Sequence, residues 1–185
     1  MKGRRSKSWA MAYCGMAAAL SVALMLLGAV IPIAMYIAPA VASFLIATVC
    51  MECGKTMALT AYGAVSLLGI LFVPDKEVVL TFVFLLGYYP LVKPYFEKIH
   101  PPLLRGVCKL LLCNGGVLVM YGLILLLIPA GSIAQEMRTT ALVVSLATLA
   151  MGNVAFLLYD RALHNMLMVY RLVWQPKLHK MLGMH

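Results

Sequence analysis

Apolar residues run through this chain in six long blocks, which proline, glycine and charged residues separate. The blocks are Trp9–Ile31, Ile37–Met51, Thr56–Val73, Val78–Phe96, Leu103–Ile128 and Thr140–Tyr159. Most of them approach the roughly 20 helical residues that one crossing of a bilayer core needs. Runs such as Val117–Ile128 lack the alternation of a membrane β-strand. The pattern therefore predicts an all-α, polytopic membrane protein, a bundle of six transmembrane helices.

The composition agrees with a membrane protein rather than a soluble domain. Of the 185 residues, 64% are hydrophobic and only 11% are charged, whereas a soluble domain carries about 25% charged residues. Such a chain has too little polar surface to cover a globule in water. We expect its surroundings to be the lipid bilayer of a bacterial inner (plasma) membrane.

The basic residues predict how the helices are oriented. In a six-helix arrangement, all but two of the 15 Lys and Arg residues fall on one side, and only Lys76 and Arg138 fall on the other. Because Lys and Arg accumulate in cytoplasmic loops, we expect both termini in the cytoplasm. A net charge of +9 could attract nucleic acid, but this one-sided distribution favours an anionic leaflet. We therefore expect no nucleic-acid partner.

A further helical pattern follows the sixth block, from Asp160 to Gln175, and we expect Pro176 to end it. Its apolar side holds Leu163, Met166, Leu167, Tyr170 and Trp174, and its polar side holds Arg161, His164, Asn165 and Arg171. Two interpretations stay open: an amphipathic helix that lies in the interface or docks on a partner, or an extension of the sixth helix. We predict a six-helix transmembrane domain over residues 1–160 and a cytoplasmic or interfacial amphipathic helix and tail over residues 161–185.

Polar side chains deep inside the predicted helices are candidate ligand contacts. They are Tyr62, Tyr88, Asn114 and Asn153. An amide or hydroxyl in hydrocarbon needs a hydrogen-bond partner, so we expect these side chains to face one another rather than lipid. They either bond directly between helices or line a cavity that holds a small molecule.

Small residues recur at four-residue intervals in the first block, at Gly15, Ala19 and Ala23, with Ala17 and Ser21 on an adjoining row. Such a ladder lets two helix backbones approach closely, which replaces the hydrophobic drive that is absent in lipid. The ladder serves either packing within the bundle or docking of a separate membrane partner.

The sequence offers no residues for an enzyme or a cofactor. It has no phosphate loop, nucleophile elbow or H-E-x-x-H motif, and we expect no cofactor, no metal and no catalysis. Cys50 and Cys53 form a C-x-x-C, but Cys108 and Cys113 are five residues apart, so we interpret all four as free thiols. We expect Lys109, one turn inside the fifth block, to snorkel to the interface.

Three features give the chain a resemblance to a known family. They are the alanine-rich start of the first helix (MAYCGMAAAL, residues 11–20), the uncharged first outer loop, and the basic loop between the fourth and fifth blocks. The chain resembles the substrate-binding S components of energy-coupling factor transporters. It is also similar to uncharacterised six-helix bacterial membrane proteins, through Tyr88-Tyr89-Pro90 and residues 153–160. The first resemblance implies a subunit that captures a vitamin or metal and docks its first helix, through Gly15, Ala19 and Ala23, on a transmembrane coupling protein that ATPases drive.

Two functions follow as expectations. The first is a substrate-capture subunit of a small-molecule uptake transporter, in which Asn114 and Asn153 line a cavity. The second is a non-transporting membrane scaffold or assembly factor, whose basic cytoplasmic face recruits partners and whose two asparagines bond directly.

Overall fold

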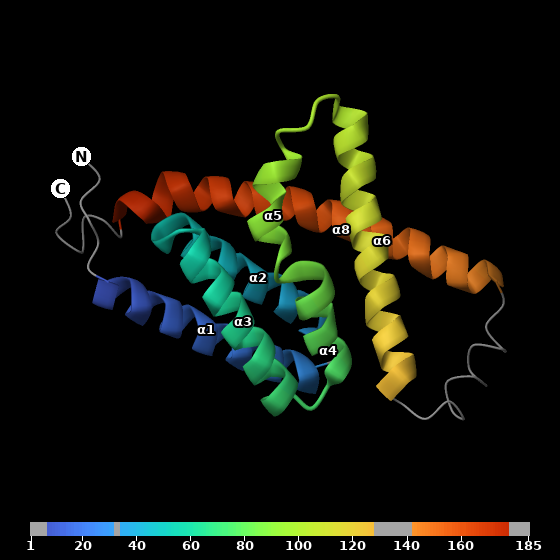
Figure 1. Cartoon of the computed structure of the whole chain (residues 1–185), viewed down its shortest axis with the longest axis horizontal. Coiled ribbons are helices and arrows are strands. Elements are labelled where there is room, and N and C mark those ends of the chain that lie inside the picture. Colours follow the sequence, from blue (N-terminus) through green and yellow to red (C-terminus); the bar gives the residue numbers. More distant parts are fainter. Residues whose placement is uncertain (1–6, 32–33, 128–141, 178–185) are drawn as a thin grey trace. The chain divides into compact units, whose positions relative to one another are not determined.

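The computed structural model describes residues 7–31, 34–127 and 142–177, and these are helical almost throughout (Figure 1). No strand occurs among the residues of these three ranges. The helices are α1 (Lys7–Val30), α2 (Ala34–Cys53), α3 (Lys55–Phe72), α4 (Lys76–Thr81), α5 (Tyr89–Phe96), α6 (Pro102–Leu127) and α8 (Leu142–Val169), with π-helical turns η1 (Phe82–Leu86) and η2 (Tyr170–Trp174). The prediction of an all-α protein is confirmed.

Five helical segments are long and apolar enough to cross a membrane. They are Lys7–Val30, Ala34–Cys53, Lys55–Phe72, Lys76–Phe96 and Leu103–Leu123. Each matches one of the first five predicted blocks to within a few residues. Helix α8 covers the sixth block from Leu142 onward but is not among the five. The sixth crossing therefore stays a prediction. Arg138, one of the two outer cations, lies outside the described residues.

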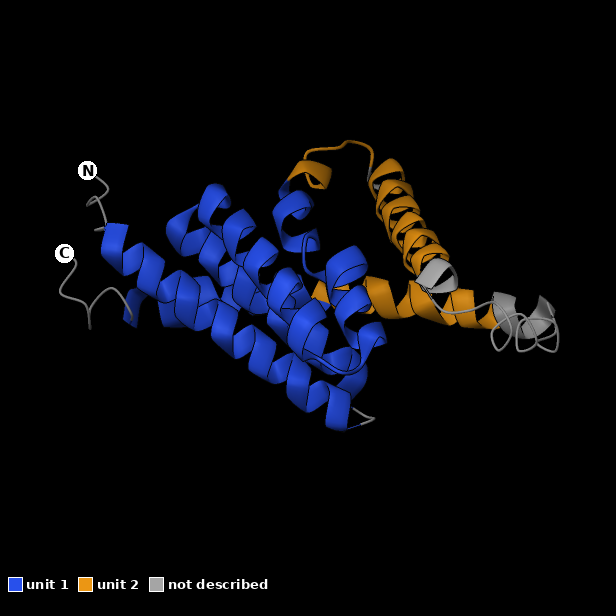
Figure 2. Cartoon of the chain, turned by 60° about the horizontal axis from the view of Figure 1, so that its bottom comes forward, with its two compact units in different colours: residues 1–94, 162–185 blue, residues 95–161 orange. Residues whose placement is uncertain are grey.

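The chain divides into two compact units (Figure 2). Unit 1 comprises residues 1–94 and 162–185, and unit 2 comprises residues 95–161. Helix α8 contributes its last turns to unit 1 and its first turns to unit 2. The segment after residue 160 therefore continues a helix that began in unit 2.

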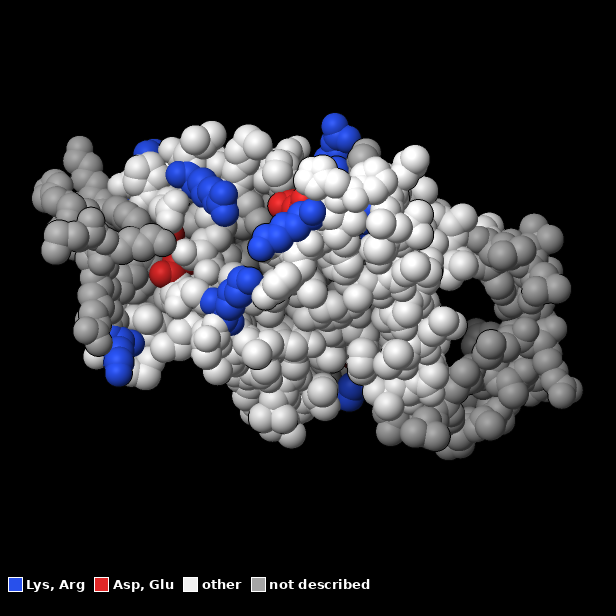
Figure 3. Space-filling view, turned by 45° about the horizontal axis from the view of Figure 1, so that its top comes forward, with Lys and Arg blue, Asp and Glu red and all other residues white. Residues whose placement is uncertain are grey.

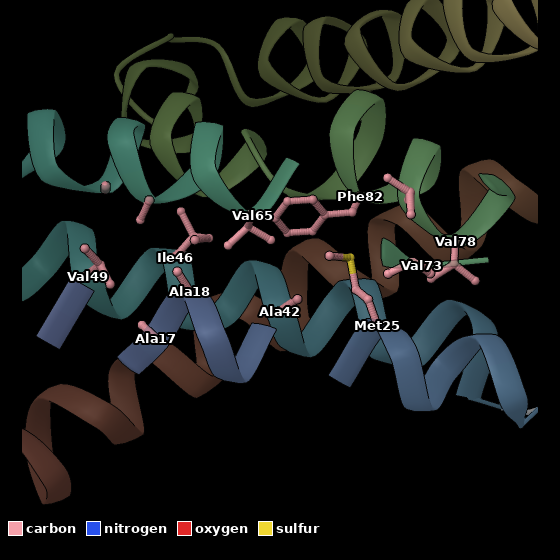
Figure 4. Close-up of a cluster of buried hydrophobic side chains, with 13 residues drawn as sticks. Ala17, Ala18, Met25, Ala42, Ile46, Val49, Val65, Val73, Val78 and Phe82 are labelled. Carbon is pink, nitrogen blue, oxygen red and sulfur yellow. The ribbon is translucent and has the colours of Figure 1, made fainter. Parts of the chain in front are cut away.

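The core of unit 1 is built from small and β-branched side chains of the first four apolar segments. Figure 4 shows Val65 and Phe82 pointing toward one another, with Met25 beside them. Helices α1 and α2 pack tightly at Gly28, where an added Cβ would lie 2.5 Å from the Ala38 Cβ. Only glycine fits there, because side chains cannot approach to that distance. This contact fixes the hairpin of the first two helices.

Short turns then fold the next two helices back onto this hairpin. Gly54 separates α2 from α3 at a φ of 92°, a left-handed conformation that favours glycine. At the far end of α3, the Lys76 ammonium donates to the carbonyl oxygens of Ile70 and Val73, at 2.8 and 3.0 Å. A cation at a helix C-terminus is favourable because the last carbonyl groups carry partial negative charge. Lys76 thus has a local structural role, whichever side of a membrane it occupies.

The fourth predicted block is not one continuous α-helix, which the sequence did not reveal. The π-turn η1 interrupts it, and the backbone bends at residues 87–88 before α5 begins. A π-turn leaves carbonyl groups without their usual partner four residues on. The Tyr62 hydroxyl donates to one of them, the Val83 oxygen, at 2.8 Å.

The C-terminal segment also differs from its prediction. The helix does not end at Pro176, since helical backbone continues to Lys177. Proline lacks its own N–H group, and its ring crowds the carbonyl group four residues before it. For Pro176 that residue is Leu172, which lies in the π-turn η2, where hydrogen bonds span five residues instead of four. The polar side of the segment is exposed, while Leu163 and Tyr170 of the apolar stripe are buried. The amphipathic helix in the interface stays a prediction.

Candidate functional site

A chain of hydroxyl groups joins three segments of unit 1 around a buried carboxyl group. Tyr170, in the π-turn η2, donates from its hydroxyl to Oε1 of Glu52 at the end of α2, over 3.1 Å. The Tyr13 hydroxyl of α1 lies 3.4 Å from the Tyr170 hydroxyl and donates to Oγ1 of Thr48 at 3.1 Å. Thr48 in turn donates to the Leu45 carbonyl oxygen at 2.8 Å.

Burial makes this cluster energetically important. Glu52 and Tyr170 are only 8% and 7% exposed, and a buried carboxyl group is costly unless it is hydrogen-bonded. Burial raises the pKa of Tyr170 above its ordinary value, and the neighbouring Tyr13 and Glu52 raise it further. Tyr170 therefore stays a neutral donor, and its bond to Glu52 fastens the C-terminal segment to the first two helices.

Aromatic rings surround the cluster. The Trp9 ring stacks on Tyr13, with centroids 5.3 Å apart, and Phe44 meets Tyr170 edge to face at 6.4 Å. Such pairs add about 0.5–1.5 kcal/mol each beyond the area that they bury. Sequence reasoning missed this cluster, although it placed Tyr170 on an apolar stripe. The sequence signal that could have revealed the cluster is Glu52, because an acid in a mostly apolar stretch needs a hydrogen-bond donor.

Two of the candidate ligand contacts lie in unit 1. Tyr62 is half-buried on α3, and its hydroxyl donates to the Val83 carbonyl oxygen in the π-turn η1. Tyr88 lies at the bend before α5, where its carbonyl oxygen accepts from the backbone N–H groups of Leu91 and Val92. These bonds give Tyr62 and Tyr88 structural roles in shaping the broken fourth segment.

The other two candidates, Asn114 and Asn153, lie half-buried in unit 2. The Asn153 side-chain nitrogen donates to the Leu149 carbonyl oxygen of its own helix, at 3.0 Å. Its oxygen Oδ1 is buried and has no hydrogen-bond partner in the part of the chain that the structure describes. A buried acceptor without a donor costs about 1–3 kcal/mol. Asn153 thus presents an acceptor that a ligand with an N–H or O–H group could satisfy.

Unit 2 also contains an ion pair that the sequence interpretation missed. Lys109 of α6 lies 2.6 Å from Oδ2 of Asp160 on α8, and the two side chains are 9% and 17% exposed. The expectation that Lys109 snorkels to the interface is wrong. Its ammonium group is buried against a carboxylate, which compensates part of the cost of desolvating both charges.

The small-residue ladder lies on the outside of unit 1. Gly15, Ala19 and Ala23 are all exposed, and a Cβ added at Gly15 would meet nothing within 4 Å. The adjoining row packs inward instead, with Ala17 at 8% and Ser21 at 0% exposure. Internal packing of α1 in unit 1 therefore uses the adjoining row and leaves the ladder uncovered.

The cysteines and other potential ligands form no metal centre in the described ranges. All five cysteines are free thiols. Cys53 and Cys14 donate weakly to the carbonyl oxygens of Ala10 and Met57. No group of three or more His, Cys, Asp or Glu side chains that could hold a metal ion occurs among the described residues.

Comparisons with protein-family models, with curated proteins and with solved structures found no match to this chain.

Proposed function

We propose that the chain spans a membrane and serves as the substrate-capture subunit of a small-molecule uptake transporter, docking on a coupling protein through its first helix. The observation that carries the proposal is the exposed ladder of Gly15, Ala19 and Ala23, beside a buried row on the same helix. Nothing in the described part of unit 1 packs on this face, and small residues offer lipid tails no advantage.

The surface supports the membrane part of the proposal. Five apolar segments have the length of a bilayer crossing, and most of the face in Figure 3 carries neither basic nor acidic side chains. Large apolar residues are widely exposed, among them Leu67, Leu71, Leu118 and Met16, at 66–75%. A soluble monomer rarely exposes apolar patches on this scale.

The unpaired oxygen of Asn153 supports the capture part of the proposal. Tyr62 and Lys109 bond within the chain, which is what a scaffold needs as well. Asn153 Oδ1 is buried without a donor among the described residues, and a scaffold gains nothing from that cost. A neutral ligand that carries hydrogen-bond donors would offset it.

The docking face is tested by two leucines placed on the ladder, Ala19→Leu with Ala23→Leu. Since both alanines are exposed, we expect the variant to fold normally and to lose its membrane partner and ATPase on affinity purification in mild detergent. The matched control, Thr60→Leu with Ala64→Leu, places two leucines at the same spacing on the exposed side of α3 and keeps the partner. Equal recovery of partners by both variants contradicts docking through the ladder.

The capture role is tested by mass spectrometry of metabolites that copurify with the protein. We expect a small molecule with the wild-type chain and its loss with Asn153→Leu. A wild-type protein that carries no small molecule, but brings down soluble cytoplasmic proteins without an ATPase, would favour the scaffold.

A further inference from the structure

One end of unit 1 gathers both tryptophans of the chain around the buried hydroxyl cluster. Trp9 stacks on Tyr13, which touches Tyr170, and Trp174 follows Tyr170 by about one helical turn. Trp and Tyr side chains concentrate where a membrane meets water, because one end of the ring is apolar and the other polar. Trp9 and the exposed Trp174 match such a belt, whereas the Tyr13 and Tyr170 hydroxyl groups bond inside the unit.

Exposed cations lie within a few positions of these residues, or of Glu52, in the sequence. They are Lys7 at the start of α1, Lys55 just beyond Glu52, Arg171 next to Tyr170, and Lys177 at the end of the described segment. The nearby acid in this cluster, Glu52, is buried under the Tyr170 hydroxyl. The exposed charge of this end is therefore positive.

Apolar side chains stand among the same cations. Leu172 is 71% and Trp174 is 62% exposed, although both neighbour the buried Tyr170. Water alone is a poor environment for this combination, and so is hydrocarbon. A layer of negatively charged headgroups above acyl chains satisfies both kinds of group.

The hydroxyl cluster holds this surface in place. Because Tyr170 is fixed from inside by Glu52 and Tyr13, the residues after it cannot turn their apolar side inward without breaking those bonds. Arg171, Leu172 and Trp174 therefore stay exposed around the helix, while Tyr170 stays buried.

We infer that this end of unit 1, formed by Lys7, Lys55, Arg171, Trp174 and Lys177, binds anionic phospholipid headgroups. The inference rests on the membrane part of the proposed function and is independent of substrate capture. Each cation near the surface should raise the local concentration of anionic lipid by up to about fivefold.

The test uses the fluorescence of Trp174, made the single tryptophan by Trp9→Phe. The full chain is reconstituted in mixed phosphatidylglycerol and phosphatidylcholine bilayers, in which one lipid or the other carries brominated acyl chains that quench tryptophan. We expect brominated phosphatidylglycerol to quench at least about twofold more strongly per mole than brominated phosphatidylcholine. Arg171→Gln with Lys177→Gln removes two of the four cations and should lower that ratio.

A matched control removes two cations from unit 2, Lys98→Gln with Arg105→Gln, and should leave the ratio unchanged. Equal quenching by the two lipids in the Trp9→Phe protein overturns the inference. So does a preference that Arg171→Gln with Lys177→Gln leaves undiminished. Absence of quenching by either lipid overturns it by placing Trp174 away from the bilayer, and none of these outcomes decides whether the protein captures a substrate.

Discussion

Breaking the ion pair between Lys109 and Asp160 should destabilise the protein strongly. The Lys109→Met variant keeps the aliphatic stem but leaves the Asp160 carboxylate without its 2.6 Å partner in a site that is 17% exposed. Removing one partner of a buried pair costs about 3–5 kcal/mol. Because both side chains keep some solvent contact, we expect the lower end, about 3 kcal/mol. Asp160→Leu, which leaves the Lys109 ammonium without this partner, should have a similar effect.

The assay is equilibrium unfolding in mixed micelles of a mild detergent and dodecyl sulfate, followed by circular dichroism. Asp160 makes further contacts besides Lys109, so a double-mutant cycle is needed to isolate the pair. The double variant Lys109→Met with Asp160→Leu should recover most of the loss, because it leaves no unpaired charge. A coupling energy below about 0.5 kcal/mol would refute the reasoning, since the two groups would then not depend on one another.

Two further predictions concern unit 1 and use the same unfolding assay. Gly28→Ala should cost about 1–3 kcal/mol, because its Cβ would lie 2.5 Å from that of Ala38. Gly15→Ala should stabilise α1 by about 0.5–1 kcal/mol, because a Cβ there meets nothing within 4 Å. If Gly28→Ala and Gly15→Ala changed the free energy of unfolding equally, the packing of α1 on α2 would be contradicted. Tyr170→Phe should cost about 1–2 kcal/mol, because it leaves the buried Glu52 carboxyl group without this donor. The variant should also make the C-terminal segment sensitive to limited proteolysis. Unchanged stability and protease resistance would show that Tyr170 does not fasten this segment.

The helices themselves could be predicted from the sequence because long apolar blocks leave few alternatives. The bounds of α1 and α3 differ from their predicted blocks by one or two residues at each end. The length of an apolar run and the charged residues or prolines at its ends determine such helix boundaries locally. The break at η1 was not predictable in the same way, because no residue type marks a π-turn in a run such as FVFLL.

The side-chain partners could not be predicted, because they come from residues far apart in the chain. Lys109 and Asp160 are 51 positions apart, and Tyr170 and Glu52 are 118 positions apart. Each residue alone had an adequate local explanation, a snorkelling lysine or a stripe tyrosine. Only the packing of the helices shows which charge meets which donor.

The ladder on α1 was recognisable from its spacing, but its surroundings were not. Periodicity places Gly15, Ala19 and Ala23 on one row and Ala17 and Ser21 on another. It does not say which row packs inward. The structure buries the second row and exposes the first.

The membrane arrangement on which the proposals depend is tested most directly by thiol labelling of single-cysteine variants. In a protein freed of its five cysteines, the exposed residues Lys7, Lys76, Lys98 and Lys177 are changed to cysteine one at a time. A six-helix chain with both ends in the cytoplasm predicts that an impermeant reagent added to intact cells labels Lys76→Cys alone. It labels the other three only after the membrane is opened. Labelling of Lys98→Cys or Lys177→Cys in intact cells would contradict that arrangement.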